Sequence, residues 1–174
     1  MGGVSAPIER ELRRIEEDAL FSAKRHFNAQ GFWNLVHYGI GIPTVVLAAV
    51  AGATASTHHE SAASLTALTA AVLAGLSTFL NPNKRAVEHG QVGNRYLSLR
   101  NRSRIVREID LIAETDEKAL VTRTKELAAE RDKLNQESPT TPRLAFVMAR
   151  RGIEGGEADY AVDHRSNQGR EPEK

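Results

Sequence analysis

Two long uncharged stretches interrupt an otherwise charged sequence. Residues 35–55 and 62–80 contain no Asp, Glu, Lys or Arg, and the six residues 56–61 separate them. As helices they would measure roughly 31 Å and 28 Å, close to the hydrocarbon core of a bilayer. The pattern therefore predicts an all-α membrane protein with a two-helix transmembrane hairpin at residues 35–80. A buried hairpin in a soluble protein is the alternative, although a soluble helix of this length normally carries several charges.

The first 34 residues predict an amphipathic helix on the cytoplasmic side. Apolar residues recur every three or four positions on one face, whereas Glu and Arg occupy the other. The apolar face consists of Ile8, Leu12, Ile15, Ala19, Ala23 and Phe27. Phe32, Trp33 and Tyr38 follow where the helix would reach the lipid headgroups, which is typical of an interfacial aromatic belt.

Residues 81–137 predict a long cytoplasmic helical region after the second span. Asn81-Pro82-Asn83 should end or kink the span. One apolar position then recurs every seven residues, as in a coiled coil: Val92, Leu99, Val106, Ala113, Leu120, Leu127 and Leu134. We call these residues the seam. Only Ile109 fits a second apolar line, so we expect the seam to pack on the N-terminal helix or on neighbouring subunits. A break at 114–116 and a continuous helix both remain open.

The last segment, residues 138–174, combines a linker, a short apolar segment and a tail. Ser138 to Pro142 reads S-P-T-T-P, which is typical of a linker. Leu144 to Met148, flanked by Arg143, Arg150 and Arg151, could dock on the helical bundle or touch the membrane surface. The polar, Gly-rich remainder is expected to be mostly disordered.

Basic residues predict the orientation of the hairpin. Lys24 and Arg25 precede the first span, Lys84 and Arg85 follow the second, and the connecting loop has neither Lys nor Arg. Because basic residues prefer the cytoplasmic side, we expect both termini in the cytoplasm.

Small and hydroxylated residues form patterns inside the spans. Small residues every four positions allow close approach of helices in lipid, and the packing candidates are Thr44, Ala48, Gly52, Ala67, Ala71 and Gly75. A stripe on the opposite face of the second span, Thr66, Thr69 and Ser77, is the candidate pore lining. Alternatively, each hydroxyl bonds a carbonyl of its own helix.

Composition argues against several other functions. The chain has no cysteine and a formal net charge of +1 with mixed signs, so we expect no thiol chemistry and no nucleic-acid binding. His58-His59-Glu60 is expected to be a solvated loop rather than a metal site. No charge lies inside the spans and no catalytic arrangement is recognisable, so we expect no enzyme, no cofactor and no ion-coupled transporter.

Several motifs resemble the SLATT family, a two-transmembrane effector domain associated with bacterial nucleotide-signalling systems. The chain contains A-K-R-H-F, V-L-A-A-V-A-G, T-F-L-N-P-N-K-R-A and E-H-G-Q-V-G-N-R-Y-L-S-L-R. The most specific positions are Asn81, Pro82, Lys84, His89, Gly93, Tyr96 and Leu99, and the ending resembles the family at Arg150, Ile153, Gly155, Tyr160 and Asp163.

The resemblance implies an antiviral effector in the bacterial inner membrane. A partner protein or nucleotide-signalling enzyme, encoded nearby, would trigger it, and the chain would then assemble into a homo-oligomer and permeabilise the membrane. The alternative is a membrane-anchored scaffold whose cytoplasmic helices recruit a soluble partner without forming a pore.

Overall fold

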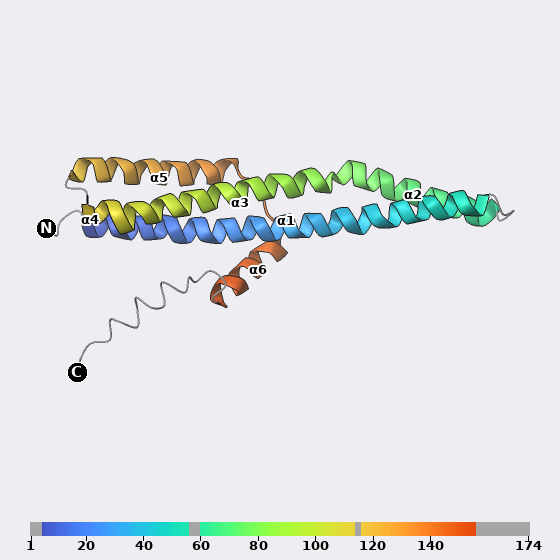
Figure 1. Ribbon diagram of the computed structural model, residues 1–174, viewed down its shortest axis with the longest axis horizontal. Coiled ribbons are helices and arrows are strands. Elements are labelled where there is room, and N and C mark those ends of the chain that lie inside the picture. Colours follow the sequence, from blue (N-terminus) through green and yellow to red (C-terminus); the bar gives the residue numbers. More distant parts are fainter. Residues whose placement is uncertain (1–4, 56–59, 114–115, 156–174) are drawn as a thin grey trace, which may run out of the picture. The chain divides into compact units, whose positions relative to one another are not determined.

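The computed structural model describes residues 5–55, 60–113 and 116–155, and every element in these ranges is helical (Figure 1). The elements are α1 (Ser5–Ala55), α2 (Glu60–Leu80), α3 (Pro82–Ile105), the π-helix η1 (Val106–Asp110), α4 (Leu111–Ala113), α5 (Glu117–Glu137) and α6 (Arg143–Glu154). The all-helical prediction is therefore confirmed. The expectations for His58 and His59, for Glu114 and Thr115, and for the tail from residue 156 lie outside the described residues.

The chain divides into two compact units. The first contains residues 1–28 and 92–174, and the second contains residues 29–91. Helices α1 and α3 each contribute residues to both units.

The first unit has a hydrophobic core built from α1, α3 and α5. The apolar face predicted for the N-terminal helix is buried from Ile8 to Ala23, with Leu12, Ile15 and Ala19 fully inaccessible to solvent, and Phe27 is partly buried against the core. Leu99, Val106, Leu120, Leu127 and Leu134 of the seam belong to the same core, and Val92 packs against it. Residues seven apart lie on one side of a helix, so the structure places the seam against the N-terminal helix within one chain.

The π-helix η1 shifts the phase of the seam. Val106 is buried, but Ala113, seven residues later, is exposed, and Leu111 packs against the core instead. Ile109, which fitted a second apolar line in the sequence, is 57% exposed. A π-turn holds more residues than an α-turn, so the residue five positions after Val106 returns to the buried side. The expected continuation of the seam through Ala113 is therefore wrong.

A new helix begins after Asp116. The Asp116 backbone is extended, and its carboxylate accepts hydrogen bonds from the backbone N–H groups of Lys118 and Ala119, at 2.9 Å and 3.4 Å. This is an N-cap, in which a side chain satisfies donors that the helix leaves free. Of the two alternatives at 114–116, the structure has the break.

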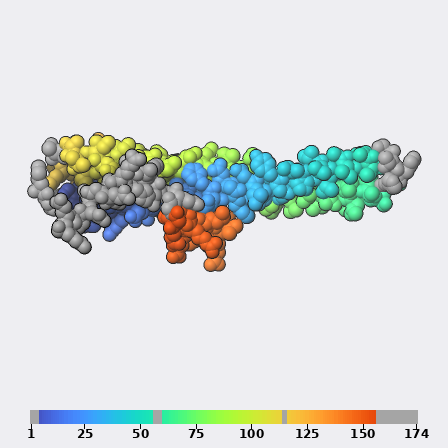
Figure 2. Space-filling model, turned by 60° about the horizontal axis from the view of Figure 1, so that its bottom comes forward, coloured from blue at the N-terminus to red at the C-terminus, as the bar shows by residue number. Residues whose placement is uncertain are grey.

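The second unit contains residues 29–55 of α1, all of α2 and the first turns of α3. In Figures 1 and 2, α2 lies alongside this part of α1. Asn81 separates α2 from α3 with a left-handed backbone (φ 45°), and Pro82 starts α3. Asn tolerates this conformation and Pro is favoured in the first helical turn, so the local sequence explains the break.

Candidate functional site

The apolar parts of α1 and α2 present their large side chains to the surroundings. None of the residues in the most apolar part of α1 is buried. In the most apolar part of the helix that begins at Glu60, 6% of the residues are buried. Exposed large residues include Leu35, Tyr38, Ile42, Val45 and Val46 of α1 and Leu65, Leu68, Val72 and Phe79 of α2. Both helices are long and apolar enough to cross a membrane, judged by length and composition. The first unit, by contrast, buries an apolar core among its own helices.

The better-covered side of each apolar helix follows alternating steps of three and four residues. In α1 the half-buried line is His37, Ile40, Thr44, Leu47, Ala51 and Thr54. In α2 the buried or half-buried line is Ala63, Thr66, Ala70, Leu73, Ser77 and Leu80. Such spacing keeps a line of side chains on one side of a helix that packs along its neighbour.

The predicted small-residue faces lie elsewhere. Ala48 and Gly52 of α1 and Ala67, Ala71 and Gly75 of α2 are exposed; of the six candidates only Thr44 is half-buried. A Cβ on Gly52 or Gly75 would meet no atom within 4 Å. A line of residues that are four apart rotates by about 40° per step around a helix. Such a line therefore turns away from a neighbouring helix that packs along its length. Packing of the two spans through these faces, as expected from the sequence, is therefore not observed within the chain.

The hydroxyls of the candidate pore lining bond their own helix. Thr66 Oγ1 donates to the Ala62 carbonyl at 2.9 Å, and Thr69 Oγ1 donates to the Leu65 carbonyl at 2.8 Å. This confirms the alternative interpretation for both threonines. Thr66 and Ser77 are half-buried on the covered side of α2, whereas Thr69 is exposed.

An arginine closes the end of α2. Arg85 Nε donates to the Leu80 carbonyl at 3.0 Å, and the guanidinium Cζ lies 4.8 Å from the centroid of the Trp33 ring. The arginine thus satisfies a carbonyl that α2 leaves free and forms a cation–π contact. From the sequence, Arg85 was interpreted only as an orienting charge. The one sequence signal for its role at the end of α2 was its position three residues after Pro82.

Two further motif residues of the second unit are buried on α3. His89 is 4% exposed. Burial lowers the pKa of its imidazole, Glu88 opposes this by raising the pKa, and Arg85 lowers the pKa by a smaller amount. A Cβ on the adjacent Gly90 would come within 2.8 Å of the Gln30 amide nitrogen. Lys84, by contrast, is exposed and pairs with Glu88 at 3.8 Å.

The next motif residues connect the helices of the first unit. A Cβ on Gly93 would come within 2.8 Å of the Phe27 ring. The Tyr96 ring stacks on His26 with centroids 5.8 Å apart, and its hydroxyl donates to Asn135 Oδ1 at 2.8 Å. Tyr96 therefore connects α1, α3 and α5. Sequence reasoning identified Tyr96 but not its partners His26 and Asn135, because nothing local relates these positions.

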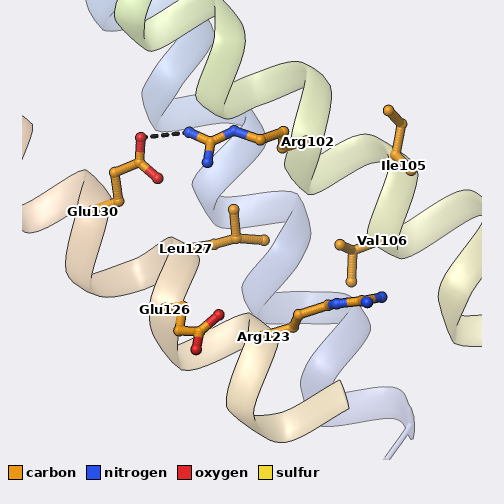
Figure 3. A pocket seen from close by; sticks show the side chains of 7 residues that line it. All are labelled: Arg102, Ile105, Val106, Arg123, Glu126, Leu127 and Glu130. Carbon is orange, nitrogen blue, oxygen red and sulfur yellow. Dashed lines mark hydrogen bonds and ion pairs between the residues drawn. The ribbon is translucent and has the colours of Figure 1, made fainter. Parts of the chain in front are cut away.

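An open groove of about 340 Å³ lies between α3, η1 and α5 in the first unit (Figure 3). Its lining residues are Arg102, Ile105, Val106, Arg123, Glu126, Leu127 and Glu130. Arg102 pairs with Glu130, and Arg123 pairs with Asp110. The charges on the rim are thus balanced by carboxylates. Nothing in the lining favours an anion. Within residues 5–55, 60–113 and 116–155, no group of His, Asp and Glu is arranged to hold a metal ion.

No family model, no curated protein and no solved structure matches this chain.

Proposed function

We propose that the chain is an effector of the bacterial inner membrane that oligomerises and permeabilises the membrane when a partner triggers it. In this proposal residues 35–55 and 62–80 cross the bilayer as a hairpin, with both termini in the cytoplasm. The observation that carries the proposal is the exposed apolar surface of these residues. Contiguous apolar surface of this extent on a protein normally meets a lipid or a partner.

Charge placement supports the bilayer as the surroundings of this surface. Both ends of the hairpin carry basic residues, namely Lys24 and Arg25 before it and Lys84 and Arg85 after it. The Arg85–Trp33 contact joins a basic and an aromatic residue at one end. Both residue types favour the membrane interface, and the basic residues favour its cytoplasmic side.

The exposed small-residue faces support an oligomer. Two helices cannot enclose a pore, so permeabilisation requires several subunits. Gly52 and Gly75 have open space around them in the single chain, and small residues let helices approach closely in lipid. In the oligomer these faces form contacts between subunits. Among the hydroxylated candidates, the exposed Thr69 is the residue that faces a pore.

The trigger is the part of the proposal that rests on the resemblance to the SLATT family. A nucleotide-signalling enzyme or sensor protein encoded nearby would activate the chain during infection. The resulting loss of the membrane barrier would arrest the infected cell.

A scaffold without a pore is the second candidate function. The observation that favours it is the group of exposed isoleucines on the first unit, where Ile105, Ile109 and Ile112 are 48%, 57% and 83% exposed. A soluble partner could bind there while the hairpin serves only as an anchor.

Replacement of the hairpin separates these two functions. Residues 35–80 would be exchanged for an unrelated two-span anchor and expressed with the neighbouring genes. Growth arrest and the membrane potential would be measured after the trigger. With the foreign anchor, a pore-forming effector no longer arrests growth and no longer dissipates the membrane potential. Retention of growth arrest together with an intact membrane potential would support the scaffold and contradict the pore.

A further inference from the structure

Helix α6 packs on α1 through its smallest residues. Ala145 and Ala149 are 2% and 0% exposed, and Gly152 is also buried. Asn28 Nδ2 of α1 donates to the Ala145 carbonyl at 3.4 Å, and the Phe21 and Phe146 rings meet edge to face with centroids 5.3 Å apart. Figure 2 shows α6 as an orange-red projection. The small residues, together with the Phe146 ring, thus form the docking face.

Three of the larger apolar residues of α6 remain exposed. Leu144 and Met148 are 57% and 51% exposed, and Val147 is 43% exposed. This reverses the usual burial of an amphipathic helix, in which large apolar side chains are covered first. The uncovered residues therefore have room for another apolar surface.

Arginines adjoin this uncovered apolar surface. Arg143, Arg150 and Arg151 are exposed, and Arg150 forms an ion pair with Glu154 at 2.9 Å. Three arginines and one glutamate give α6 a net charge of +2. Leu144, Met148 and Arg151 follow one another at steps of four and three, so they lie on one side of the helix. Apolar side chains beside a guanidinium match the boundary between acyl chains and phosphate headgroups.

We propose that α6 is a binding site for anionic phospholipids on the cytoplasmic surface of the membrane. Arg143 and Arg151 bind headgroup phosphates, and Leu144 and Met148 enter the acyl-chain boundary. The exposed apolar residues of α6 and its net positive charge together match an anionic lipid surface. The α6 site rests on the proposed function, because it takes the chain to be inserted in a membrane.

A single-cysteine label tests this site in the full chain. Because the protein has no cysteine, Met148→Cys carries the only label, an environment-sensitive fluorophore. The protein is reconstituted in two kinds of nanodisc, one of phosphatidylcholine alone and one that also contains phosphatidylglycerol. Both kinds carry a lipid-borne quencher. We expect a blue shift and quenching that require phosphatidylglycerol. Arg143→Gln or Arg151→Gln should each weaken this response about fivefold, the factor for about 1 kcal/mol per basic residue at an anionic surface.

Two control labels distinguish the possible failures. Lys125→Cys on the exposed side of α5 should respond to neither lipid, and Leu65→Cys on α2 should be quenched in both discs. Quenching at residue 65 with the same spectrum at residue 148 in both discs would overturn the α6 site alone. An absence of quenching at residue 65 would overturn the membrane placement and the α6 site together. A response at residue 148 that requires an added protein instead of phosphatidylglycerol would also overturn the α6 site.

Discussion

Phe27 occupies the space in which any side chain on Gly93 would have to lie. A Cβ built on Gly93 comes within 2.8 Å of Phe27 Cε1 and 3.1 Å of Cζ. Gly93 is buried on α3, and one turn later Tyr96 stacks on His26, the neighbour of Phe27 on α1. The absence of a side chain at position 93 therefore sets how closely α3 approaches α1 in the first unit.

Gly93→Ala should destabilise the protein by about 1–3 kcal/mol, because the rigid Phe27 ring must move to admit a methyl group into a packed core. Chemical unfolding of the full chain in detergent, followed by circular dichroism, measures the change. Gly90→Ala should cost less, since it meets the flexible end of Gln30. Gly31→Ala is the matched control, because nothing lies within 4 Å of its Cβ. Equal stability of the Gly93 and Gly31 variants would contradict the close contact.

Glu16 and Arg107 form a largely buried ion pair between α1 and η1. Arg107 Nε and Nη2 donate to the Glu16 carboxylate at 2.7 Å and 3.1 Å, and the side chains are 13% (Glu16) and 15% (Arg107) exposed. The hydrogen bonds to Glu16 raise the pKa of Arg107, so the guanidinium stays charged. The pair holds the π-helix against the N-terminal helix.

Glu16→Gln should lower the free energy of unfolding by about 1.5–3 kcal/mol, the range for hydrogen bonds to charged groups. Glu9→Gln is the control on the same helix, because Glu9 pairs with Arg13 on the exposed surface. It should leave the unfolding midpoint nearly unchanged. Similar midpoints for the two variants would show that the buried pair adds no more than an exposed one.

His89 should make the stability depend on pH. Burial lowers its pKa, Glu88 partly opposes this shift, and Arg85 lowers the pKa by a smaller amount. A lowered pKa means that folding favours the neutral imidazole. The stabilisation is therefore complete above the unfolded pKa of about 6.5 and is lost as the pH falls through the folded value.

Unfolding midpoints between pH 8 and pH 5 test this dependence. His89→Gln keeps a neutral polar side chain and should flatten the loss below about pH 6.5, the unperturbed pKa of histidine. Glu88→Gln removes the charge that raises the His89 pKa, so it should deepen the loss. An unchanged acid slope in His89→Gln would assign the pH dependence to other groups.

Gly52→Leu and Gly75→Leu should weaken the proposed oligomer without disturbing the single chain. Both positions are exposed, and a Cβ would meet nothing within 4 Å, so the side chain has room in the monomer. A bulky leucine would separate subunits that approach through these faces. Gly39→Leu, in the same helix as Gly52 and equally open, is the control. Crosslinking in membranes measures subunit association, and wild-type crosslinking of both variants would exclude these faces as interfaces.

Periodicity predicted much of the first unit. Ile8, Leu12 and Ile15 were expected on one apolar face, Leu99 and Leu120 were expected on one seam, and all five lie in one core. Regular spacing succeeds here because helix geometry alone decides which residues share a face. It failed at Ala113, because the π-helix adds a residue to one turn and no local residue type announces it.

The sequence by itself determined that the chain is helical, where its two uncharged stretches lie and which residues share a face of a helix. Only the tertiary structure decided which face is covered. In α2 the line through Thr66 and Ser77 is the covered side and the Gly75 face is open, whereas α6 docks through Ala149 and leaves Met148 exposed. The physical reason is that spacing is a property of one helix, whereas burial depends on the shape of its neighbour and on how closely their backbones approach.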